Sequence, residues 1–143
     1  MNEGEKRVLF IGDPVYVKAA IVPRVERLKG SKLAHEVASF SEEAERILGG
    51  GRITHVVMFN LYHTETNHPA PLEGPYAMVS VDELVEESKL PSILVTPDSR
   101  LKKYAPGRCV VLPRRNKRGI EILPAHVYDI PEEQAREIVS LLN

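Results

Sequence analysis

The residues best suited to chemistry in this sequence follow its short apolar runs. Carboxylate, amide and hydroxyl groups at such positions can bind a cation, orient a substrate or accept a proton. If the runs are parallel strands, their carboxyl ends share one edge of a sheet, and ligands bind beside that edge. The residues in these positions are Asp13, Ser39, Asn60, Thr96 with Asp98, and Pro113 with Arg114.

A polar segment with two histidines, residues 61–68, follows the apolar run that ends at Phe59. Imidazole and carboxylate groups bind transition metals, but the spacing between His63 and His68 does not match one helix face, and a third ligand is not evident. We therefore interpret the segment as a solvated loop and predict no metal site. In an enzymatic alternative, His63 or Asp98 acts as a general base at the strand ends.

A basic run, Arg114-Arg115-Asn116-Lys117-Arg118, offers a third candidate site. Its cations could contact phosphates. No aromatic residue interleaves them, so stacking on bases is not suggested, and the formal net charge of the chain is −1. We interpret the run as a solvated hairpin tip, whose charges also discourage edge pairing, and expect no nucleic-acid partner.

Short apolar runs alternate with helical patterns along the chain. Strands are predicted over 8–11, 33–40, 53–59, 93–95 and 109–112, and helices after Asp13-Pro14, from Ser41, over 81–89 and over 131–142. Pro23 predicts a kink or restart in the first helix. Such alternation implies parallel strands with right-handed crossovers. The predicted fold is α/β: a doubly wound, flavodoxin-like, mostly parallel five-stranded sheet with helices on both faces.

Two segments do not fit a simple alternation of strands and helices with short connections. Residues 60–79 form a long connection, where ~2–6 residues are usual. Residues 114–119 separate two strand-like runs, so 120–123 is predicted to add a C-terminal edge strand through a hairpin. We expect one domain over 1–143, with a core at 1–113 and the hairpin strand and last helix at 114–143.

The composition bounds the class of protein. A chain of 143 residues that is 43% hydrophobic and 27% charged is globular. Cys109, its only cysteine, lies in an apolar run and is expected to be a buried small hydrophobe. No apolar run approaches the ~20 residues that span a bilayer, so we expect a cytoplasmic protein without membrane contact. A single glutamine and many charges favour a heat-tolerant source.

Several motifs of catalysis and cofactor binding are absent from the sequence. It contains no Gly-x-Gly-x-x-Gly, no phosphate-binding Gly-x-x-x-x-Gly-Lys-Ser/Thr and no Gly-x-Ser-x-Gly elbow. His35, His55 and His126 lie in or beside strand-like runs and are expected to be packed or edge residues. We therefore predict no catalytic residue and no cofactor.

Over the first 113 residues, the sequence resembles the receiver domain of response regulators. Asp13 matches an acidic position after the first strand, and Asn60 stands where that family carries its phosphorylated Asp. Thr96 fits the hydroxyl position after the fourth strand, and Pro113 fits the Pro of a Lys-Pro pair. The segment 37–44 is similar to the second strand and second helix of the family.

The departures from the family pattern bear on its chemistry. Asn60 carries an amide and cannot form an aspartyl phosphate. One acidic residue where two are usual leaves little charge to hold Mg²⁺. Leu112 replaces the Lys that would bind the phosphoryl group. The resemblance therefore implies a pseudo-receiver, a receiver domain without phosphorylation chemistry.

Two functions follow. The first is a non-enzymatic regulatory module that binds a protein partner, independently of phosphorylation, through the 60–79 loop, the hairpin or the helix over 81–89; we also expect a homodimer. The alternative is a small-ligand or nucleotide-binding protein, or an enzyme, that uses the strand-end crevice. The residues of that alternative site are Asp13, Asn60, His63, Thr96, Asp98 and Arg100. A nucleic-acid role through Arg114, Arg115, Lys117 and Arg118 ranks third.

Overall fold

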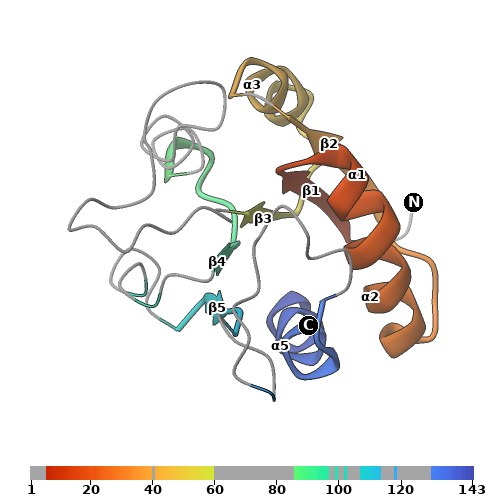
Figure 1. Ribbon diagram of the computed structural model, residues 1–143. Helices are drawn as coiled ribbons and strands as arrows, with labels where there is room; N and C mark the ends of the chain where they lie inside the picture. The colour runs from red at the N-terminus through yellow and green to blue at the C-terminus, as the bar shows by residue number, and fades with distance from the viewer. Residues whose placement is uncertain are drawn as a thin grey trace.

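In the described part of the chain, the fold is built on a five-stranded sheet in which every strand pairs in parallel with its neighbours (Figure 1). A computed structural model describes residues 6–39, 41–59, 86–96, 99, 102, 107–113, 118 and 130–143. The strand order is β2-β1-β3-β4-β5. The strands are β1 (Arg7–Ile11), β2 (Ala34–Ala38), β3 (His55–Phe59), β4 (Ser92–Thr96) and β5 (Cys109–Val111).

Helices cover both faces of this sheet, as the sequence predicts (Figure 1). One face carries α5 and the continuous helical segment formed by α1, η1 and α2, and the other face carries α3. The bounds are α1 (Pro14–Tyr16), η1 (Val17–Ile21), α2 (Val22–Lys29), α3 (Ser41–Gly49) and α5 (Glu132–Leu142). The doubly wound α/β architecture is thereby confirmed.

The larger part of the core lies between the sheet and the helices α2 and α5. Val8 and Phe10 of β1 point to this side, where Val25 and Ile138 meet them, and all four side chains are fully buried. The stripe on α5 recurs every three or four residues, at Ala135, Ile138 and Leu142, which places those side chains on one helix face.

The smaller part of the core lies under α3. Leu9 of β1 and Val56 of β3 are fully buried there, and Ala44 of α3 packs against them. Because side chains alternate across a strand, β1 needs apolar residues at consecutive positions to fill both layers. The run Val8-Leu9-Phe10-Ile11 meets that requirement.

A π-helical turn lies where the sequence predicts a kink at Pro23. The helical segment does not restart there: η1 widens the helix over Val17–Ile21, and α2 follows directly. Proline has no N–H to donate and its ring clashes with the carbonyl four residues earlier. A wider turn relieves that clash and keeps Val17, Ile21 and Val25 buried on the sheet side.

Several predicted elements fall wholly or partly outside the described residues. These are the loop over 60–79, the hairpin at 114–119, the edge strand over 120–123 and the first part of the helix over 81–89, of which residues 86–88 are helical. The second strand is shorter than the predicted 33–40 range because Leu33 and Ser39 flank the paired residues. Among the described helices, none combines the length and apolar character needed to cross a membrane.

We expect Gly30→Ala to lower the free energy of unfolding by about 1 kcal/mol, because Gly30 ends α2 in a left-handed conformation with a φ of 76°. Its N–H donates to the carbonyl of Glu26 at 2.9 Å. Urea denaturation measures the change. Gly49→Ala is the matched control: a methyl group there meets open space, so stability should hold or rise slightly. Equal losses in both variants would contradict a conformational cause.

Candidate functional site

The carboxyl edge of the sheet changes direction between β1 and β3. The chain passes from β1 to β2 on one side and then to β3 on the other, and the helices after β1 and β2 cover opposite faces. In open parallel sheets such a switch point is the usual place for a ligand. Gly12 and Asp13 follow β1 at this point, and Asn60 directly follows β3 in the sequence.

Gly12 is buried because β1 and the end of β3 approach closely here. A Cβ atom at residue 12 would lie 3.1 Å from the Cβ of Phe59, which is tighter than ordinary contact. The Gly12 N–H donates to the carbonyl of Ala38 at 2.9 Å, and the Phe59 ring stacks on Phe10 with centroids 6.2 Å apart. At the switch point, Gly12 therefore lies directly against the Phe59 side chain.

Asp13 is exposed and caps a helix. Its Oδ1 accepts a hydrogen bond from the Val15 N–H at 2.9 Å, and its backbone carbonyl accepts from Val17 at 3.0 Å. The Asp-Pro pair therefore starts the helix as the sequence predicts, with Asp13 as the N-cap and Pro14 as the first helical residue. One carboxylate oxygen already has a structural partner, which leaves less of this group for a ligand.

Thr96 ends β4 and is fully buried. Its carbonyl accepts from the Leu112 N–H at 2.8 Å, which ties β4 to the residue after β5. Leu112 is itself 6% exposed and belongs to the larger core, whereas Pro113 is exposed. Leu112, which the sequence resemblance matches to the lysine of a receiver domain, is therefore a core residue in this chain.

The structure places part of the predicted site. Asp13 and Thr96 lie at carboxyl ends of strands, but β3 separates β1 from β4, and one side chain is exposed while the other is buried. Arg118 is exposed. The remaining candidates lie outside the described residues and stay predictions: Asn60, His63, Asp98, Arg100, Arg114, Arg115 and Lys117. Within the described ranges, no three metal-ligating side chains gather.

Cys109 begins β5 and is half-buried against the smaller core. Burial raises the pKa of its thiol, and Glu137 adds to the rise, while Lys102 opposes it. A raised thiol pKa means little thiolate at neutral pH. The prediction of a buried small hydrophobe is confirmed in part, because the side chain packs against the smaller core but is only half-buried.

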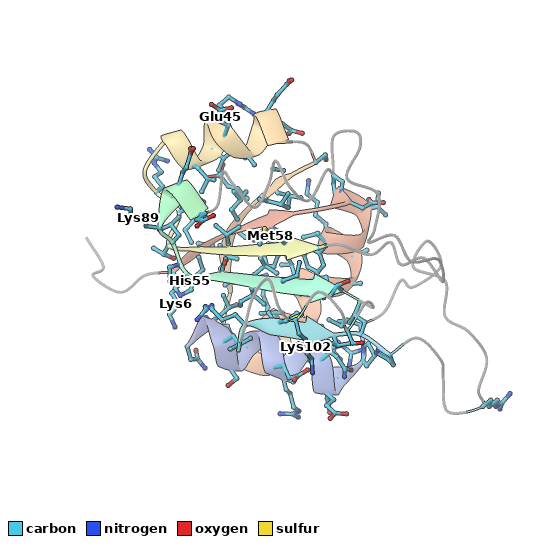
Figure 2. All side chains as sticks on the ribbon, turned by 90° about the vertical axis from the view of Figure 1, so that its left-hand side faces the viewer. Lys6, Glu45, His55, Met58, Lys89 and Lys102 are labelled. Carbon is cyan, nitrogen blue, oxygen red and sulfur yellow. The ribbon has the colours of Figure 1, made fainter. Side chains whose placement is uncertain are left out.

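A second polar group lies at the opposite, amino edge of the sheet, where Figure 2 shows Lys6 beside His55. We call Lys6, Lys29, His55 and Arg108 the amino-edge cluster. Burial lowers the pKa of His55, and the charges of Lys6, Arg108 and Lys29 lower it further. The imidazole Nδ1 lies 3.0 Å from the Thr54 hydroxyl.

Sequence reasoning missed this cluster. It treated His55 as a packed or edge residue and gave no role to Lys6 or Arg108. The three residues are far apart in the chain, and the register of parallel strands brings them to one edge. Their positions in the sequence could have indicated the cluster, because each of the three residues is the first residue of a strand or directly precedes one.

No protein-family model and no protein of curated function matches the sequence. Solved structures are similar in fold. The anti-anti-sigma factor PhyR from Bartonella quintana superposes with a TM-score of 0.55 at 16% identity, covering 95% of this chain and 46% of that one. The response regulator PhyR from Brucella abortus gives 0.53 at 13% identity, covering 94% and 46%.

This chain thus spans under half the length of the PhyR chains that it matches. At such identities the likeness concerns the fold. It confirms the predicted receiver-like, flavodoxin-like α/β domain, with a parallel sheet of the same kind.

Asp13→Ala is expected to lower the free energy of unfolding by about 1 kcal/mol, because it removes the side-chain cap of the first helix. Asp13→Asn keeps an oxygen for the Val15 N–H and should cost a few tenths. Urea denaturation at neutral pH compares the two. If Asn costs as much as Ala, the charge of Asp13 matters and the capping bond does not explain its role.

His55→Gln should flatten the dependence of stability on pH. Because the pKa of His55 in the folded protein lies below the ordinary 6.5, the unfolded chain binds that proton more readily, and wild-type stability falls as pH drops through 6.5. Above that pH the titration contributes nothing. We measure the free energy of unfolding of both proteins at about pH 7.5 and at about pH 5.5. As the pH falls, the wild type should lose more stability than the variant. A constant difference across this range would refute the lowered pKa.

Proposed function

We propose that this chain is a receiver-like regulatory module that acts by binding a protein partner and does not depend on phosphorylation. The fold supports the regulatory part of the proposal, since the similar chains are an anti-anti-sigma factor and a response regulator. Fold alone does not determine function, so the proposal rests on the carboxyl edge itself.

The observation that carries the proposal is the burial of Leu112. In a receiver domain the residue before the conserved Pro is the Lys that binds the phosphoryl group. Here that residue is an aliphatic side chain, 6% exposed, within the larger core. A cation introduced at this position would have to leave the core or lose its hydration, which costs several kcal/mol.

The neighbouring positions support the same reading. Thr96 is fully buried, so its hydroxyl does not face a ligand in solution. Asp13 uses a carboxylate oxygen to cap the first helix. Residue 60 is an amide in the sequence and has no carboxylate oxygen to attack phosphorus.

The contact surface that we propose is the 60–79 loop, the hairpin at 114–119 or the helix over 81–89. Beside the carboxyl edge, Val15 is 64% exposed and presents an aliphatic side chain, a type of group suited to the centre of a protein interface. A homodimer about a two-fold axis belongs to the same proposal, as does action in the cytoplasm.

Incubation with Mg²⁺ and acetyl phosphate, followed by intact-mass spectrometry, tests the lack of phosphorylation. We expect no covalent phosphoryl adduct on the wild type, because residue 60 has no carboxylate. A phosphorylatable response regulator run in parallel is the positive control, and Asn60→Asp is the matched variant that restores the acceptor. A stoichiometric phosphoryl adduct on the wild type would overturn the proposal.

Native mass spectrometry of the same samples, with a panel of nucleotides, distinguishes a protein-binding module from a ligand-binding protein or enzyme. A dimer that gains no ligand supports an interaction module. A stoichiometric nucleotide or Mg²⁺ adduct that disappears in Asp13→Ala would instead support a ligand-binding protein or enzyme at the strand ends.

A further inference from the structure

The amino-edge cluster lies at the end of the sheet opposite the proposed functional edge. Hydrogen bonds between neighbouring strands fix its position. The Arg7 N–H donates to the Thr54 hydroxyl at 2.8 Å, and the Thr54 N–H donates to the Arg7 carbonyl at 2.9 Å. These bonds hold Lys6, the residue before β1, beside His55, the first residue of β3 (Figure 2).

The side chains of the cluster point to the face that α2 and α5 cover. His55 stands opposite Val8 in the parallel register, and Val8 belongs to the core on that face. Arg108 directly precedes β5 and stands two residues before Val110, which belongs to the same core. The Arg108 carbonyl accepts from the Leu94 N–H at 2.9 Å, so the extended pairing reaches residue 108, and residues two apart in such a segment share a face. Lys29 ends α2, so it borders the same space.

Arg108 is the member of the cluster whose hydrogen bonding is incomplete among the described residues. Its Nε donates to the carbonyl of Ser92 at 2.6 Å. Its Nη2 is buried, and no hydrogen-bond acceptor meets it among the residues that the structure describes. A buried donor of a charged group that lacks an acceptor costs more than the ~1–3 kcal/mol of a neutral one, so an acceptor supplied from outside the chain would be stabilising.

The charges around Arg108 define what that acceptor can be. Lys6, Arg108 and Lys29 each disfavour protonation of His55, which places three cations near this imidazole. The Lys6 Nζ also donates to the Asn143 Oδ1 at 3.5 Å. Cations near helix C-termini also offset the helix dipole, and Lys29 lies in the last turn of α2. That effect accounts for a lysine at the end of a helix, but it supplies no oxygen to Nη2.

We propose that the amino-edge cluster binds a phosphate-type dianion, as inorganic phosphate or as a phosphate monoester, with Arg108 Nη2 as a donor and Lys6, Lys29 and His55 around it. Three cations favour a dianion over a single carboxylate. The Nε of Arg108 is already engaged, so the fork of Nε and Nη2 that grips a carboxylate side-on is not available. This site is independent of the proposed function, since it lies at the other edge of the sheet.

Histidine-ring NMR of the full chain tests the proposal with inorganic phosphate as the probe at constant ionic strength, first as a phosphate titration at a fixed pH near neutrality and then as pH titrations with and without phosphate. We expect the His55 ring signals to shift with saturation, and the His55 pKa to rise when phosphate occupies the site. Arg108→Gln and Lys6→Gln should each weaken the apparent affinity at least about 10-fold, as loss of a charge-assisted bond predicts. The Lys6 variant covers the case in which Arg108→Gln does not fold.

Arg136→Gln is the matched control, because it removes one positive charge from an exposed side chain paired with Glu132 at the start of α5. It should leave the phosphate titration unchanged. A non-saturating response, an equal response to chloride, or the same affinity in the control and in the cluster variants would overturn the proposal. Phosphoserine in place of phosphate distinguishes the sources: tighter binding of the monoester assigns an esterified phosphate, and equal or weaker binding assigns the free ion.

Discussion

The whole structure depends on the burial of β1 on both faces. Val8, Leu9 and Phe10 are fully buried in the middle of the sheet, with β2 and β3 as neighbours. Each such side chain contributes about 1.5–3 kcal/mol relative to exposure. Alternate residues belong to different cores, so β1 ties α3 on one side to α2 and α5 on the other. The positions of the strand ends, and therefore of both polar edges, follow from this packing.

The same packing limits what the carboxyl edge can do. Leu112 and Thr96 are held in the interior, at positions that the sequence resemblance matches to the cation and the hydroxyl of a receiver domain. One carboxylate oxygen of Asp13 is engaged in a helix cap. The amino edge differs, because the buried Nη2 of Arg108 has no acceptor among the described residues, although its Nε donates to the Ser92 carbonyl. At the carboxyl edge the Asp13 side chain thus has a hydrogen-bond partner, whereas at the amino edge the described residues leave the Nη2 of Arg108 without one.

The strands and the covering helices could be predicted because their apolar spacing is set by burial on one or two faces. Exposure of individual polar residues could not. Thr96 follows an apolar run as an accessible site residue would, and only the folded structure shows that it is buried. Pro23 predicted a disturbance, but whether a helix restarts or widens depends on which of Val17, Ile21 and Val25 must stay on the sheet. The amino-edge cluster depends on register between distant segments, which a single sequence does not display.

The π turn at η1 also affects how this chain can be compared with others. A turn closed by bonds five residues apart holds one more residue than an α-helical turn, so η1 shifts every later position of the helix by about 100° relative to an uninterrupted one. An ungapped alignment with a straight first helix would pair buried positions on one side of η1 with exposed positions on the other. Correct alignment of this helix therefore needs a one-residue insertion within 17–21, even though the number of turns is unchanged.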